Sequence, residues 1–378
     1  MPIVEQGYQH WSGRLSGHTW RWLTVARQGV RIQFRNRFLR YLLFAAWTPA
    51  FLLVCALSIW GLLERKSKAM STIIAFLRFM NPHVIRQPQY YSSEIWILVY
   101  GYFMHVELMF SMILVLVVGP GLISQDLRVN ALPLYFSRPL RRIDYFVGKW
   151  AVIGFFIGMV TILPTIVAYL FGALFSLNWT TVINGLPIAL SAIAYGLVIC
   201  ICAGTLMLAL SGLSRNLRYI ALLWLGVWFI SSVMSAVLAE SHNGALRSEY
   251  FHKVSQHPVV RLANPNTGAV PVVQGPGYWR KAWRHFEVYQ WRADHHDWRP
   301  LLSFTGDLSR VGDHLLGTND AWKKLAALEP AQRQRIRLLI HFGGPWYPWY
   351  WSAAVLVGLW VISVGILRWS VRSLDRLK

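Results

Sequence analysis

Few residues of this chain combine the types and spacing that catalysis or metal binding requires. Asp294, His295, His296 and Asp297 are metal-ligand types, but neighbouring residues on one helix cannot all converge on a single ion. A solvated polar face is the expected role of this stretch. The pair in the 200–202 segment, Cys-Ile-Cys, points its thiols to different sides of a helix, which favours packing over redox or metal chemistry. The residues therefore predict no metal site and no disulfide.

Glu107 is a carboxyl group in the middle of a long apolar run, and His105 precedes it by two residues. A charged side chain at membrane depth costs several kcal/mol, about 3 on insertion scales, unless it is paired or hydrated. Two roles stay open for Glu107 and His105: a substrate pathway or gate, or structural pairing with a polar group on a neighbouring helix. Residues two apart lie on different faces of a helix, so the two need not act together.

The sequence contains no motif for nucleotide binding. No Gly-x-x-x-x-Gly-Lys-Ser/Thr stretch is present, and the Gly148-Lys149-Trp150 sequence lacks both the upstream glycine and the hydroxyl residue that such a loop needs. If the protein works by ATP hydrolysis, the ATPase must be another chain.

The composition indicates an all-α integral membrane protein. The chain has 378 residues, of which 55% are hydrophobic and only 14% charged, whereas soluble domains are about 25% charged. Six apolar segments approach or exceed the length of about 20 residues that crosses a bilayer. They are 41–63, 95–118, 150–175, 181–212, 220–239 and 349–367.

Charge placement predicts the orientation of these spans. With six spans, both termini and the second and fourth connections fall on one side, and that side is rich in Arg and Lys, so it is expected to be cytoplasmic. Membrane lipids are expected around the bundle. The connection over 64–94 is also basic and argues the other way, but less strongly. The net charge of +21 is therefore explained mainly by the basic residues that set the orientation of the spans, and no nucleic-acid partner is expected.

The chain divides into four regions by composition. Residues 1–40 form a basic arm in which 18–40 is expected to be an interfacial helix in the headgroup layer. Residues 41–239 carry the first five spans, and 346–378 carry the sixth span and a cytoplasmic tail. Residues 240–345 are polar and form a partly helical extracytoplasmic insertion, with helices expected within 277–298 and 329–343.

One connection between spans, residues 121–149, is patterned in a way that ordinary loops are not. Gly119-Pro120-Gly121 is expected to make a sharp turn after the second span. Helical spacing then predicts a short helix over about 122–132, and Pro133 can open a second turn, so the whole element lies near 122–136. Such an element either anchors the two spans at the interface or transmits a displacement into the bundle.

This connection resembles that of the ABC-2 family of ABC transporter permeases. The residues that carry the resemblance are Asp126, Leu132, Ser137, Arg138, Pro139, Arg142, Tyr145, Gly148 and Lys149. The family has six spans, an N-terminal interfacial helix and a cytoplasmic coupling helix between spans two and three, and each has a counterpart here. Where the family often has Gly-Thr before the leucine, this chain has Asn130-Ala131, and its outer insertion is longer than in simple members.

The resemblance implies a permease subunit in the bacterial inner membrane that is not itself an enzyme and that exports substrate when a separate cytosolic ATPase dimer drives it. It implies a second permease subunit, identical or homologous, and no cofactor on this chain, because ATP and Mg²⁺ bind to the ATPase. The residues it assigns to ATPase coupling are Gln125, Asp126, Arg128, Asn130 and Leu132.

Two alternatives remain from the sequence. One is a membrane-embedded enzyme acting on lipid-linked substrates through residues such as Glu287, His295 or His296. The other is a scaffold whose outer segment recruits an extracytoplasmic protein partner. The first predicts activity without nucleotide, and the second predicts that the 122–136 element can be scrambled without effect.

Overall fold

The computed structural model describes residues 20–64, 90–132, 135, 141–176, 179–256, 282–283, 286, 289, 297–328 and 347–375. All regular elements in these ranges are helical. They are α1 (Arg21–Gln33), α2 (Arg37–Glu64), α5 (Ser92–Val118), α6 (Gly121–Arg128), α8 (Arg142–Val160), α9 (Ile162–Ser176), α10 (Trp179–Leu213), α11 (Leu217–Leu225), the π-helix η2 (Gly226–Ile230), α12 (Ser231–Gln256), the 3₁₀-helix η3 (Arg299–Leu302), α14 (Phe304–Leu316), α15 (Thr318–Ala327) and α17 (Trp349–Asp375).

Six helical runs in the described chain are long and apolar enough to cross a membrane. They are Arg37–Glu64, Ser92–Arg128, Arg142–Ser176, Trp179–Leu213, Leu217–Val254 and Trp349–Trp369. Each run contains one of the six predicted segments, so the six-span, all-helical fold is confirmed. The fourth span continues through Pro187, which lies inside α10.

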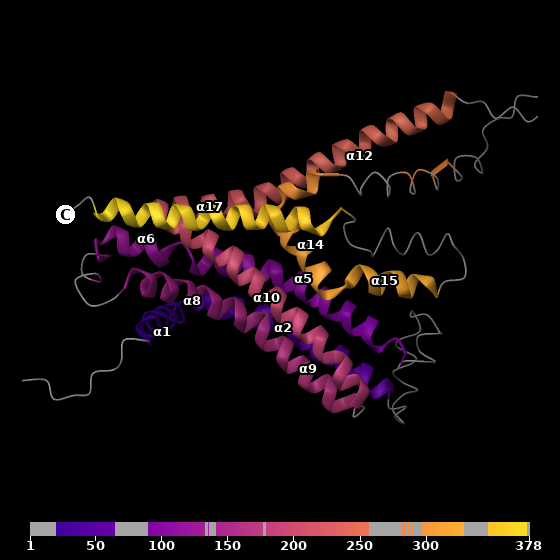
Figure 1. Cartoon of the computed structure of the whole chain (residues 1–378), viewed down its shortest axis with the longest axis horizontal. Coiled ribbons are helices and arrows are strands. Elements are labelled where there is room, and N and C mark those ends of the chain that lie inside the picture. Colours follow the sequence, from indigo (N-terminus) through magenta and orange to yellow (C-terminus); the bar gives the residue numbers. More distant parts are fainter. Residues whose placement is uncertain are drawn as a thin grey trace, which may run out of the picture.

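The helices form one bundle with two distinct ends (Figure 1). α1, α6 and the C-terminal end of α17 lie at one end, called here the α6 end. α15 lies at the opposite end, the α15 end, and α12 projects away from the bundle on that side. Within the bundle α5 packs against α2, α8 and α10, and α10 also packs against α9 and α17. α5 and α10 are therefore the central pair.

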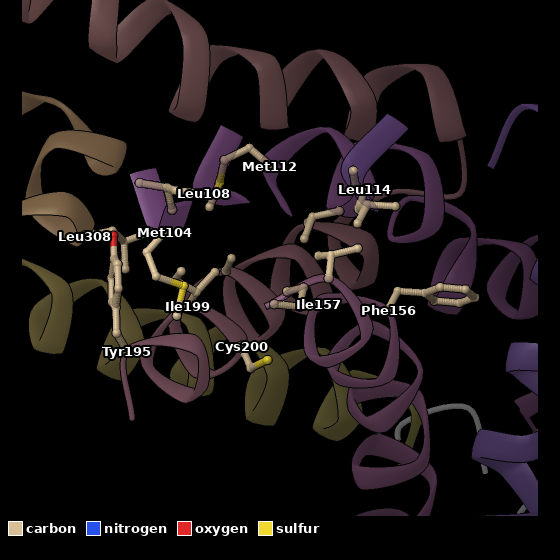
Figure 2. Packing of buried hydrophobic residues seen from close by; sticks show 14 of the residues in the cluster. Met104, Leu108, Met112, Leu114, Phe156, Ile157, Tyr195, Ile199, Cys200 and Leu308 are labelled. Carbon is tan, nitrogen blue, oxygen red and sulfur yellow. The ribbon is translucent and has the colours of Figure 1, made fainter. Parts of the chain in front are cut away.

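The core between α5 and α10 depends on close helix approach. Trp96 of α5 is 1% exposed, and a Cβ atom at Gly172 of α9 or Gly185 of α10 would lie 2.8 or 2.7 Å from its indole ring. Further along the bundle, Met104 and Leu108 of α5 gather with residues of α8, α10 and α14 in one apolar cluster (Figure 2). The central helices therefore have little freedom to rotate against each other.

The N-terminal segment differs from the prediction. The helix expected over 18–40 is two helices, because α1 ends at Gln33 and α2 begins at Arg37. The side chain of Asn36 accepts a hydrogen bond from the backbone N–H of Phe38 at 3.0 Å. An asparagine that bonds to the N–H two residues ahead starts a new helix, so the arm changes direction before it enters the first span.

The sharp turn predicted after the second span is also absent. Gly119 (φ −72°, ψ −45°) and Pro120 (φ −55°, ψ −36°) both keep right-handed helical geometry. Pro120 has no N–H to give to the helix ladder, so the ladder is interrupted without reversing the chain. Gly119 is required for packing, since a Cβ atom there would lie 2.1 Å from Cγ of Met207 in α10. α6 is therefore the continuation of α5.

Candidate functional site: the α6 connection and the α14 cluster

α6 is shorter than the helix predicted over about 122–132, because it ends at Arg128 in a Schellman motif. Asn130 has a positive φ of 50°, the left-handed geometry that ends many helices. The N–H of Ala131 donates to the carbonyl of Asp126 at 2.9 Å, and the N–H of Asn130 donates to that of Leu127 at 3.4 Å. Glycine and asparagine tolerate this geometry best, which explains how Asn130 can end the helix here.

Replacing Asn130 with valine should therefore weaken the end of α6. A β-branched residue in left-handed geometry costs about 1–2 kcal/mol, whereas Asn130→Gly should be close to neutral. The measurement is the midpoint of thermal unfolding of the detergent-solubilised protein. Equal midpoints for the valine and glycine variants would contradict the role of Asn130 as the helix terminator.

The start of α6 is capped by a side chain from α10. Oγ of Ser211 accepts hydrogen bonds from the backbone N–H groups of Ile123 (3.1 Å) and Ser124 (3.2 Å), and it donates to the carbonyl of Pro120 at 2.9 Å. The first N–H groups of a helix have no partner within the helix, so Ser211 supplies one from another span. This residue was missed by the sequence analysis, because nothing in the local pattern relates it to α6.

Asp126 joins α6 to α8. Its Oδ2 atom accepts a hydrogen bond from the Tyr145 hydroxyl at 2.6 Å and pairs with Nζ of Lys149 at 2.7 Å. The side chains of Lys149 and Asp126 are 13% and 15% exposed, and Tyr145 is fully buried. Three residues of the predicted motif thus form one contact, the Asp126 triad.

The predicted coupling residues fall into two groups. Gln125, Arg128 and Asn130 are exposed, whereas Leu132 is buried and Asp126 is turned toward α8. Val129, which the pattern did not single out, is 71% exposed. The surface offered at this end of the bundle, called here the α6 surface, is therefore Gln125, Arg128, Val129 and Asn130.

Gly148 of the motif lies where α1 crosses α8. A Cβ atom there would lie 2.7 Å from Cβ of Val25 and 2.8 Å from the backbone oxygen of Trp22. Gly29 of α1 allows the same close approach from the other helix, because a Cβ atom added there would lie 2.5 Å from Val152 of α8. The motif glycine thus allows α1 to lie directly against α8.

The rest of the motif is only partly described. Arg142 is exposed at the start of α8, and Ser137, Arg138 and Pro139 lie outside the described residues. Asp297 pairs with Arg299 at 2.9 Å, while Glu287, His295 and His296 also lie outside. In the described part of the chain no three His, Cys, Asp or Glu side chains are placed to hold a metal ion. The three cysteines are free.

Glu107 and His105 have different surroundings. Glu107 is fully buried, and neither of its carboxyl oxygens has a hydrogen-bond partner among the described residues. His105 is exposed, with Nδ1 at 3.1 Å from the carbonyl of Gly101 and Nε2 at 2.6 Å from Oγ of Ser309. Because only a protonated Nδ1 can bond to a carbonyl, Nε2 accepts the proton of Ser309 in the neutral ring. His105 therefore ties α5 to α14.

α14 carries a polar cluster that the sequence analysis missed. Asp307, Arg310 and Asp313 recur every three residues and are all buried, because α14 is inserted between α5, α10 and α17. Nε of Arg310 donates to the carbonyl of Tyr347 at 2.7 Å, and Oδ1 of Asp313 accepts from the Thr318 hydroxyl at 2.9 Å. The three-residue spacing of charges was the available signal, but the sequence does not say that this stripe faces inward.

Comparison with known proteins identifies the family. Residues 36–304 match the family described as ABC-2 family transporter protein. No curated protein matches the chain. The match covers most of the chain, including the first five spans and the Asp126 triad. The chain therefore belongs to the ABC-2 family and is a multi-pass membrane protein, a transport subunit of ABC transporters.

Proposed function

We propose that this chain is the permease subunit of an exporter that a separate cytosolic ATPase drives through the α6 surface. The observation that carries the proposal is the continuity of α5 and α6 as one helical run, Ser92–Arg128, joined to α8 by the Asp126 triad. A displacement applied to α6 is then carried into the second and third spans together. A flexible loop would not transmit it.

The orientation follows from charge. We infer that the α6 end is cytoplasmic and that the membrane is the bacterial inner membrane. Basic residues at the starts of α2 and α8 and around the α10–α11 junction support this, since positive residues are retained on the cytoplasmic side. Export, rather than import, is the direction expected of this family of permeases.

The missing phosphate-binding loop and the exposed apolar surface of the spans indicate the partners. ATP and Mg²⁺ would bind to the ATPase pair, since the sequence has no phosphate-binding loop. A second permease subunit would cover part of the apolar surface of α2, α11–α12 and α17, the spans that are least buried within one chain. Lipid would cover the remainder.

Co-purification tests the proposal. The tagged full-length chain is extracted in mild detergent from its own host, and the proteins that elute with it are identified and quantified. A stoichiometric ABC ATPase is the expected result. Recovery without any ATPase, whether alone or with extracytoplasmic proteins only, would overturn the proposal and favour the scaffold or enzyme alternatives.

Arg128→Glu should weaken this association. The side chain is exposed at the C-terminal end of α6, and reversing one charge at a contact changes affinity by about 1–3 kcal/mol, or roughly 5- to 150-fold. The ATPase recovered per permease should fall while the unfolding midpoint stays the same. Arg40→Glu, an exposed arginine near the start of α2, is the matched control. Equal losses in both variants would point to general electrostatics instead of the α6 surface.

A further inference from the structure

Asp307 is a carboxyl group without a cationic partner among the described residues, at the interface between α14 and α17. The residue is completely buried, and neither carboxyl oxygen makes a hydrogen bond of normal geometry with the described residues. The groups that face it are the hydroxyls of Ser352 and Tyr347. Burying a carboxylate without a cation is far more costly than burying the neutral acid.

The charged groups around α14 are engaged elsewhere. The Arg310 guanidinium bonds to the Tyr347 carbonyl, and Arg299 of η3 pairs with Asp297. The other titratable or polar groups that face α14 belong to α5, α10, α12 and α15 and lie near Asp313 or at the start of α14. They are His105, Tyr195, Ser232 and Thr318. Among the described residues, then, no cation compensates a charge on Asp307.

We propose that α14 is a proton-regulated element, seated in the bundle while Asp307 is neutral and loosened when Asp307 ionises. The ligand of this site is the proton, and the device acts at α14, where it packs between α5, α10 and α17. The proposal depends on the fold alone and would survive if no ATPase partner were found.

The direction of the pH effect follows from proton linkage. Burial raises the pKa of Asp307 to about 7, and the Ser352 hydroxyl offsets this only in part, whereas an exposed aspartate titrates near 3.9. Between these two values the seated form keeps a proton that the released form loses. Seating is therefore strongest below about pH 4, weakens as the pH rises to about 7, and is constant above that.

Asp313 contributes less to this dependence. Burial raises its pKa as well, but His105, the Thr318 hydroxyl and Arg310 all favour its charged form. The proton that controls seating is therefore the one on Asp307. Because His105 also ties α14 to α5, loosening of α14 frees the helix that continues into α6.

The test is the accessibility of a buried cysteine on α14. In a full-length protein whose three native cysteines are replaced by alanine, Leu308→Cys places a thiol at a fully buried position, and Leu315→Cys places one at a position that is 36% exposed. The ratio of their labelling rates with a soluble maleimide cancels the pH dependence of the thiol itself. Between about pH 5 and pH 7 the ratio should rise at least tenfold, because one linked proton can shift an equilibrium by up to about a hundredfold over two pH units.

Two substitutions decide whether Asp307 is the group. Asp307→Asn mimics the neutral acid, so the ratio should stay low and flat across this pH range. Asp297→Asn, at a buried aspartate that already has an arginine partner, should leave the rise unchanged. A labelling ratio that does not change with pH when Asp307 is present, or a rise that persists in Asp307→Asn, would overturn the proposal.

If Asp307→Asn does not fold, Ser352→Ala replaces it. Losing the hydroxyl that favours the carboxylate should move the pH midpoint of the rise in the labelling ratio to higher pH. An unmoved midpoint counts against Asp307.

Discussion

Asp126→Ala is expected to destabilise the bundle by about 2–4 kcal/mol, because it leaves Lys149 and Tyr145 without their shared partner in a site that is mostly shielded from water. The expected result is a clear fall in the thermal unfolding midpoint in detergent. Stimulation of the proposed ATPase partner should fall as well, since α6 would no longer be tied to α8. Because the substitution leaves the residues of the α6 surface unchanged, a loss of stimulation would show that Asp126 acts by positioning α6.

A double-mutant cycle separates this contact from general damage. Asp126→Asn keeps an oxygen for the Tyr145 hydroxyl but removes the ion pair, and Lys149→Met removes the ammonium while keeping the alkyl stem. A coupling of about 1–3 kcal/mol between the two is expected. The control is Glu249→Gln, whose ion pair with Lys253 is fully exposed, and which should leave the midpoint unchanged. Strictly additive effects of Asp126→Asn and Lys149→Met would show that the pair is not coupled.

Gly148→Leu is the second large effect. Its side chain would overlap Val25 and the backbone of Trp22, and a backbone atom cannot rotate away. Overpacking of this kind costs about 1–3 kcal/mol, and α1 should separate from α8. The measurements are the unfolding midpoint and the protease sensitivity of the N-terminal arm, which should increase.

Other glycines provide controls for this prediction. Gly158→Ala on the same helix meets its nearest neighbour, Ile162, at an ordinary 3.7 Å, so it should be neutral or stabilising by up to about 1 kcal/mol. Gly29→Ala overlaps only the Val152 side chain, and Val152→Ala should rescue it. If Gly148→Leu behaved like Gly158→Ala, the close crossing of α1 and α8 would be refuted.

These contacts show that several residues of the family motif have a structural role. Asp126, Tyr145 and Lys149 connect α6 to α8, and Gly148 allows α1 to approach the same helix. A pattern that resembles a docking motif is thus largely a device for holding the connection between two spans in place. The residues that remain exposed for a partner are fewer and include Val129, which the resemblance did not assign.

The number of spans could be predicted from the sequence, because it depends on properties that each segment carries alone. An apolar run of sufficient length crosses a bilayer whatever surrounds it. The orientation inferred from the basic flanks stays a prediction. Residues 41–63 and 349–367 needed no knowledge of their neighbours. The family resemblance was equally local, since it depended on one 30-residue connection, and the family match bears it out.

Which side of each helix faces the protein could not be predicted in this way. Asp126 has the sequence context of an exposed residue, and Asp307, Arg310 and Asp313 have that of a surface helix, yet all four are turned inward. Their orientation depends on α8, α10 and α17, which come from distant parts of the chain. A helix's own pattern limits its possible faces, but the free energy of packing against its neighbours selects one, and that term exists only once the bundle has assembled.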